Sequence, residues 1–151
     1  MISTGPDNVL QPRPAAAPTV LVVEDERISR EALTHLLDHS GFHATACGSA
    51  EEALETLAEM PAPVVALVDV DLPGMSGLDF VARLEQLRPG LPAVLITAAG
   101  GDRISRFREQ HDVGYIRKPL DFGHLLKLLG HRREARFNKP QDNPAPNRDL
   151  S

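Results

Sequence analysis

The sequence predicts an α/β fold, a doubly wound five-stranded parallel sheet flanked by five helices. Short apolar runs alternate with segments of helical periodicity, and glycine or proline separates many of them. A strand that is followed by a helix before the next strand favours parallel pairing, because a parallel connection needs a crossover. The 151 residues, 42% of them hydrophobic, suit one core rather than two.

The first two strand-and-helix units carry clear local signals. Val20 to Val23 is an apolar, β-branched run, and a helical face follows it. His43 to Cys47 is a weaker strand, and Ser49 is placed to cap a helix with acidic residues in its first turn. The first helical face consists of Ile28, Ala32, Leu33, Leu36 and Leu37.

Three further units complete the sheet. The third strand, Val64 to Val68, is apolar on both faces, as in a buried parallel sheet. The other elements are a helix over 78–87, a strand over 93–97, a short helix over 104–110, a strand over 114–117, and a helix from 120 to about 137. The short helix is weakly specified, because Ile104 and Phe107 are its large apolar anchors.

Composition divides the chain and limits its function. The proline-rich ends of the sequence predict a flexible arm over 1–18 and a helix extension with a flexible tail over 131–151. The segment between them, 19–130, is predicted to be the folded domain. A net charge of -5 argues against direct nucleic-acid binding. The lone Cys47 and the shortness of every apolar run lead us to expect a cytoplasmic protein without membrane contact.

Polar residues follow the strands of this predicted sheet. Glu24 and Asp25 follow the first strand, Asp69 follows the third, Thr97 ends the fourth, and Lys118 follows the fifth. The carboxyl ends of parallel strands form the edge at which ligands bind, so these side chains are expected to meet. Clustered carboxylates need a cation, and an all-oxygen site suits Mg²⁺. A carboxylate can also attack phosphorus, so the set predicts phosphoryl transfer.

Four motifs in order carry a resemblance to a known family. The segment Leu67 to Gly77, reading Leu-Val-Asp-Val-Asp-Leu-Pro-Gly-Met-Ser-Gly, closely resembles the phosphoacceptor segment of bacterial response-regulator receiver domains. The other three matches are Val22 to Glu26, Ile96 to Ala98, and Tyr115 to Pro119. The resemblance covers roughly residues 19 to 130 and implies the flavodoxin-like receiver fold of a single-domain, chemotaxis-regulator-like protein of two-component signalling.

The resemblance implies a phosphoacceptor and a Mg²⁺ site. Asp69 takes the phosphoryl group, and Asp25, Asp69 and the backbone carbonyl of Asp71 are direct metal ligands. Glu24 also belongs to the metal site, although aspartate is commoner at this position of the family.

The resemblance also implies a switch. Lys118 pairs with the phosphoryl group, Thr97 reorients toward it, and Tyr115 turns inward when Thr97 moves. Ala98 leaves room for that rotation, and a cis peptide bond joins Lys118 to Pro119. Taken by itself, Tyr115 is as consistent with an ordinary core aromatic as with a switch.

A receiver implies partners. A sensor histidine kinase or a histidine phosphotransfer protein would donate the phosphoryl group, and a target protein or a second copy would bind the surface from strand four to helix five. The long final helix, with Arg132, Arg133 and Arg136, supports a homodimer or partner contact as a hypothesis. The chain is thus expected to be a phosphoacceptor switch that assists its own phosphorylation and dephosphorylation, rather than an enzyme.

Three alternatives stay open at this point. The first alternative is the receiver fragment of a longer DNA-binding or effector regulator, and the second is a receiver that no longer accepts phosphate. The third alternative is a haloacid-dehalogenase-like phosphatase, since Asp69-Val70-Asp71 fits the Asp-x-Asp motif of that family. It is disfavoured because that motif usually lies near the N-terminus and precedes a longer chain.

Overall fold

Five parallel strands form one sheet in the order β2-β1-β3-β4-β5 in the computed structural model, which describes residues 17–98 and 101–138. Each neighbouring pair of strands in this sheet is parallel, which confirms the predicted fold class. The strands are β1 (Thr19–Val23), β2 (His43–Cys47), β3 (Val65–Asp69), β4 (Ala93–Thr97) and β5 (Gly114–Arg117).

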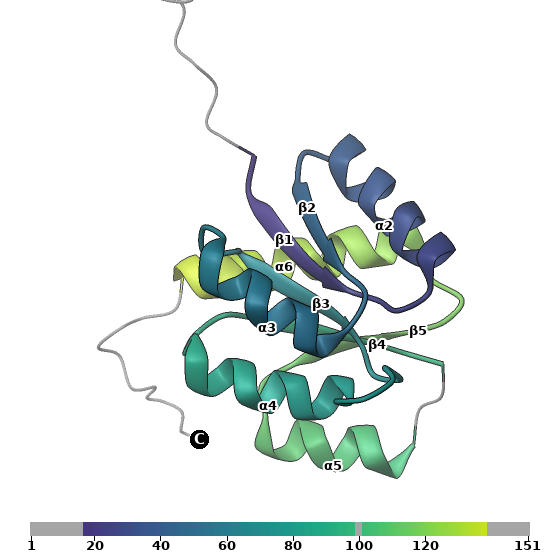
Figure 1. Cartoon of the computed structure of the whole chain (residues 1–151), viewed down its shortest axis with the longest axis vertical. Helices are drawn as coiled ribbons and strands as arrows, with labels where there is room; N and C mark the ends of the chain where they lie inside the picture. The colour runs from purple at the N-terminus through teal and green to yellow at the C-terminus, as the bar shows by residue number, and fades with distance from the viewer. Residues whose placement is uncertain (1–16, 99–100, 139–151) are drawn as a thin grey trace, which may run out of the picture.

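Helices cover both faces of the sheet (Figure 1). Helices α3, α4 and α5 pack on one face, and α2 and α6 pack on the other. Their bounds are α2 (Arg27–His39), α3 (Ala50–Glu59), α4 (Gly77–Leu87), α5 (Asp102–Gln110) and α6 (Phe122–Asn138). The two layers account for the apolar character of the strands, since neither face of the sheet is left to solvent.

The central strands divide their side chains between two cores. In β1, Leu21 and Val23 face α3 and α4, whereas Val20 and Val22 face α2 and α6. This division follows from the two-residue period of a strand. Phe80 of α4 is fully buried in the first core. The sheet is therefore a rigid platform for the residues that follow its strands.

Local signals explain where several helices begin. The Ser49 hydroxyl accepts a hydrogen bond from the Glu52 amide at 3.0 Å, which confirms the predicted cap of α3. The weakly specified helix α5 forms because Ile104 is buried and Phe107 packs against the same core. It begins at Asp102, two residues before the predicted start, since the Ser105 amide donates to the Gly101 carbonyl.

The boundaries of β3 and α6 also differ from the prediction. Strand β3 runs one residue later than predicted, because Asp69 pairs with Ile96 and the Val70 amide donates to the Ile96 carbonyl at 2.8 Å. Helix α6 begins at Phe122 rather than at residue 120, because the Asp121 side chain caps it by accepting from the His124 amide at 3.0 Å. The first difference brings Asp69 into the sheet itself.

The predicted arm and tail lie largely outside the described residues, as do the side chains of Arg133 and Arg136. Across residues 17–98 and 101–138, no helix has the length and apolar character needed to cross a membrane.

Candidate functional site

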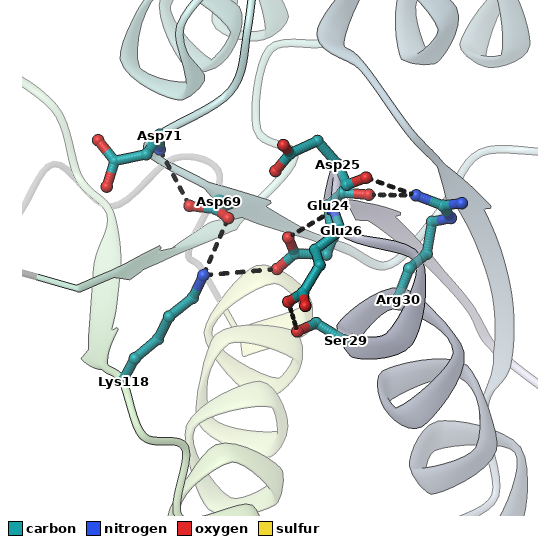
Figure 2. A network of polar contacts seen from close by, with 8 residues as sticks. All are labelled: Glu24, Asp25, Glu26, Ser29, Arg30, Asp69, Asp71 and Lys118. Atoms are coloured by element: carbon teal, nitrogen blue, oxygen red, sulfur yellow. Dashed lines mark hydrogen bonds and ion pairs between the residues drawn. The ribbon is translucent and has the colours of Figure 1, made fainter.

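The candidate site lies at the carboxyl edge of the sheet, where the winding reverses between β1 and β3. The chain leaves β1 toward β2 on one side and adds β4 and β5 beyond β3 on the other. Such a reversal is where ligands bind in open α/β sheets. Glu24 follows β1, Asp69 ends β3, and Lys118 follows β5, and Figure 2 shows all three side chains converging.

Asp69 is at the centre of this network. Its side chain is nearly inaccessible, with 2% of the residue exposed. Its Oδ1 accepts a hydrogen bond from the Asp71 amide at 2.9 Å, and its Oδ2 accepts one from Lys118 Nζ at 3.1 Å (Figure 2). A buried carboxylate is costly unless it is paired. The two donors therefore hold the Asp69 carboxylate in a fixed orientation.

Two more carboxylates lie beside Asp69. Among the described residues, Glu24, Asp25 and Asp69 form an acidic group in which one carboxylate oxygen from each residue lies within 4.8 Å of the other two. Glu24 is buried and Asp25 is exposed, so the group opens to solvent at one side. Hard divalent cations such as Mg²⁺ bind carboxylate and carbonyl oxygens and keep several waters. The donor set and its open side fit such an ion.

The acidic group carries more negative charge than the single charge of Lys118 can balance. Burial, together with the negative charge of Asp69, raises the pKa of Glu24 to about 7, against the opposing effects of the Glu26 amide and Lys118. Partial burial lowers the pKa of Lys118, but its hydrogen bond to Asp69 and the nearby carboxylates outweigh this, and the net pKa is raised. Lys118 thus stays protonated and lies 3.8 Å from Glu24 Oε1.

The structure also places the remaining predicted residues. Thr97 is buried at the end of β4, and its carbonyl accepts a hydrogen bond from the Lys118 amide at 2.9 Å. Asp71 contributes its amide to the site, while its exposed carboxylate points away from Asp69 (Figure 2). The peptide bond between Lys118 and Pro119 is cis, as the resemblance implied.

Tyr115 lies on the surface rather than in the core. It is 37% exposed, and the Arg108 guanidinium lies 4.7 Å from the centre of its ring. The interpretation of Tyr115 as an ordinary core aromatic is therefore wrong. Ala98, the small residue after Thr97, is exposed as well.

Two residues around the site were not predicted from the sequence. Arg30 Nη1 donates hydrogen bonds to the carbonyls of Glu24 and Asp25. Glu51, which the sequence marked only as an acid in a first helical turn, accepts one from the Met75 amide at 2.9 Å. This bond lowers the pKa of Glu51. Both contacts join a side chain to the backbone of a turn, five and six residues away for Arg30 and 24 residues away for Glu51. No spacing in the sequence signals either pair.

Comparison with known proteins gives one consistent result. The family model "Response regulator receiver domain" matches residues 20–130. The probable transcriptional regulatory protein TcrX of Mycobacterium tuberculosis is 40% identical over 113 residues, which are 74% of this chain and 47% of TcrX. The response regulator protein FleR of Pseudomonas aeruginosa is 39% identical over 114 residues, which are 75% of this chain and 24% of FleR.

A solved structure agrees in fold. The CheY-like response regulator receiver domain protein of Methanospirillum hungatei JF-1 superposes with a TM-score of 0.74 at 23% identity, covering 82% of this chain and 98% of that one. The chain spans less than half the length of both sequence relatives described above.

Proposed function

The chain belongs to the response regulator receiver domain family, and from this membership we propose that it is a phosphorylation switch with Asp69 as its phosphoacceptor. Receiver domains are signalling switches, so membership in this family favours a switch over the haloacid-dehalogenase-like phosphatase. The observation that supports the phosphoacceptor is the buried Asp69 carboxylate, held by Lys118 at 3.1 Å within an acidic group at the edge of the sheet. A buried carboxylate with one ammonium and two acidic neighbours costs stability, and such groups are typical of functional sites.

The transfer itself involves one carboxylate oxygen of Asp69. That oxygen forms a bond to phosphorus while the bond from phosphorus to the donor breaks, and the donor keeps the electron pair. The donor is the phosphohistidine of a sensor kinase or of a phosphotransfer protein. Lys118 pairs with an oxygen of the transferred group, and the Thr97 hydroxyl hydrogen-bonds another. These residues serve transfer onto and off the chain's own Asp69, so we propose a switch and not a turnover enzyme.

Mg²⁺ fits the same residues. Asp25, Asp69 and the backbone carbonyl of Asp71 would hold the ion, with Glu24 beside them. When bound, Mg²⁺ supplies positive charge that offsets the charge of the phosphoryl oxygens. The acidic group supports this assignment, because one oxygen from each of its three carboxylates lies within 4.8 Å of the other two and the single charge of Lys118 cannot balance three carboxylates.

The output surface would be formed by β4, α5, β5 and α6. Thr97 turns toward the phosphoryl group, and Tyr115 then leaves its exposed position and turns inward past Ala98. A cavity of about 340 Å³ on this face supports a contact with a target protein or with a second copy. It is lined by Tyr115, Ile116, Arg117, Pro119, Asp121 and His124.

A longer protein is compatible with this proposal. Because the chain spans 47% of TcrX and 24% of FleR, it also fits the receiver part of a regulator with a separate output domain. Detection of the natural protein by immunoblotting, at a mass near or well above 16.4 kDa, distinguishes the two forms. A cytoplasmic location is proposed for both, consistent with the free Cys47.

Phosphorylation with acetyl phosphate and Mg²⁺ tests the phosphoacceptor. Intact-mass measurement is expected to show one phosphoryl adduct, and peptide mapping after borohydride reduction should place it on Asp69. Asp69→Asn should show no adduct. The matched control is Asp71→Asn, because its exposed side chain is two residues away and only its backbone takes part.

The outcome that contradicts the proposal is equally clear. An adduct on Asp69→Asn, or none on the wild type with either acetyl phosphate or a phosphorylated histidine kinase, would mean that Asp69 is not a phosphoacceptor. Loss of the adduct from Asp71→Asn would assign the side chain of Asp71 a role that the proposal denies it.

A further inference from the structure

Arg30 connects the acidic turn after β1 to helix α2. Its Nη1 donates to the carbonyl of Glu24 at 2.8 Å and to the carbonyl of Asp25 at 3.1 Å (Figure 2). One guanidinium nitrogen therefore binds two consecutive backbone carbonyls. These belong to two of the three residues whose carboxylates form the acidic group.

The turn that Arg30 binds carries carboxylates that repel one another. One carboxylate oxygen from each of Glu24, Asp25 and Asp69 lies within 4.8 Å of the other two, and like charges at this distance repel. The sheet fixes the start of the turn, because the Glu24 amide donates to the Cys47 carbonyl at 3.0 Å. Asp25 lies beyond that hydrogen bond and is exposed. Repulsion would therefore act mainly on the position of Asp25.

The contact restrains the backbone and leaves the carboxylates available. Arg30 binds the carbonyl oxygens of Glu24 and Asp25, so their side-chain oxygens can still bind a cation. A guanidinium suits this role, because it presents several donors in a fixed plane. Gly48 leaves room for it, since an added Cβ at that position would lie 3.3 Å from Arg30 Nη1.

We propose that Arg30 is a positioning residue for the metal site, holding the acidic turn in the conformation that binds Mg²⁺ and so setting the affinity for that ion. The inference rests on the proposed function, since it concerns the same site. Arg30 binds the backbone of the acidic turn and not the phosphoacceptor, so it affects how much Mg²⁺ is needed and leaves the maximal rate of phosphorylation nearly unchanged.

Arg27 provides a matched control on the same helix. Its guanidinium pairs with Glu31 at 3.4 Å, and both side chains are exposed. Arg27→Gln and Arg30→Gln remove the same charge from α2, but only Arg30→Gln removes the hydrogen bonds to the acidic turn. Arg30→Lys keeps the charge and restores part of the hydrogen bonding, so it should restore part of the affinity.

Titration of Mg²⁺ into the protein by calorimetry is the primary test, with circular dichroism to verify folding. Loss of a residue that orients metal ligands commonly weakens binding 10–100-fold, so Arg30→Gln is expected to raise the Mg²⁺ Kd by about tenfold or more. Arg27→Gln should stay within about twofold of the wild type, as a surface pair contributes little. With acetyl phosphate, the Mg²⁺ concentration for half-maximal rate should rise in parallel, and the rate at saturating Mg²⁺ should change by less than about threefold.

Each outcome decides the inference. Equal Mg²⁺ Kd values for folded Arg30→Gln and Arg27→Gln, or a lower maximal rate with an unchanged Kd, would overturn it. If Arg30→Gln does not fold, folded Arg30→Lys with a wild-type Kd would overturn it as well, and a raised Kd would support it. A wild-type protein that binds no Mg²⁺ and forms no adduct would instead refute the proposed function, and the inference with it.

Discussion

Lys118 Nζ lies 3.1 Å from Asp69 Oδ2, which joins the end of β5 to the end of β3 across the intervening strand β4. The same ammonium lies 3.8 Å from Glu24 Oε1 at the end of β1. In the described structure, one cation thus faces two buried carboxylates from different strands. The stability of this edge of the sheet therefore depends on Lys118 when no metal ion is bound.

Replacement of this lysine should destabilise the metal-free protein. Lys118→Met leaves the buried carboxylates of Asp69 and Glu24 without their ammonium partner. Because the Lys118 side chain is 34% exposed, we expect a moderate decrease in the free energy of unfolding, about 1–3 kcal/mol. Urea denaturation in EDTA measures it, and Mg²⁺ should recover part of the loss. Lys127→Met, an exposed lysine of α6, is the control, and an equal loss there would contradict the assignment.

Two glycine substitutions should act in opposite directions. Gly77 begins α4 directly against β3, and an added Cβ would collide with the Asp69 carbonyl oxygen and approach Val70 Cα to 2.8 Å. Gly77→Ala is therefore expected to lower the free energy of unfolding by about 3 kcal/mol. Gly130 lies in α6, and an added Cβ there would meet no atom within 4 Å, so Gly130→Ala should raise the free energy of unfolding by about 0.5–1 kcal/mol. Thermal unfolding of both variants gives the comparison, and equal signs would refute it.

Glu51 should make the turn after β3 dependent on pH. The hydrogen bond from the Met75 amide lowers the pKa of Glu51 below its ordinary value of 4.5. A depressed pKa stabilises the fold above the unfolded value, and this contribution is lost as the pH falls through the folded one. The stability advantage of the wild type over Glu51→Gln should therefore be full above about pH 5 and shrink as the pH falls below 4.5.

Urea denaturation at several pH values measures that advantage. Glu55→Gln reports the general effect of removing one negative charge from α3 and is subtracted from the result. A constant difference between wild type and Glu51→Gln from pH 3 to pH 7 would show that the hydrogen bond to Met75 does not couple to protonation.

The sequence was sufficient to predict the sheet and the positions of its polar edge. Strands β1, β3 and β4 are short apolar runs, and a polar residue follows or ends each of them: Glu24, Asp69 and Thr97. Parallel pairing then brings these ends together without further information. Asp69 was expected just beyond β3 and instead ends it, a difference of one residue that leaves the site unchanged.

Contacts between a helix side chain and the backbone of a turn could not be predicted in the same way. Arg30 belongs to the polar part of an amphipathic helix, and its periodicity says only that it avoids the core. Whether it contacts solvent or the carbonyls of Glu24 and Asp25 depends on the path of the turn after β1. Likewise, the alternation within β5 accounts for the exposure of Tyr115, which shares the exposed side of the strand with Arg117, but it does not predict the contact of the Tyr115 ring with Arg108 of α5.

Tyr115 offers a direct optical test of the proposed switch. The chain has one tyrosine and no tryptophan, so its tyrosine fluorescence reports on this residue alone. Tyr115 is 37% exposed beside the Arg108 guanidinium, and an inward rotation would separate the two and remove the ring from water. We expect Mg²⁺ with beryllofluoride to change the fluorescence and reduce quenching by iodide.

Asp69→Asn should not respond, because it cannot hold the phosphoryl mimic. Thr97→Ala should bind the mimic with little change at Tyr115, since the hydroxyl that couples the two is missing. A full response in Thr97→Ala would show that the rotation of Tyr115 does not depend on Thr97.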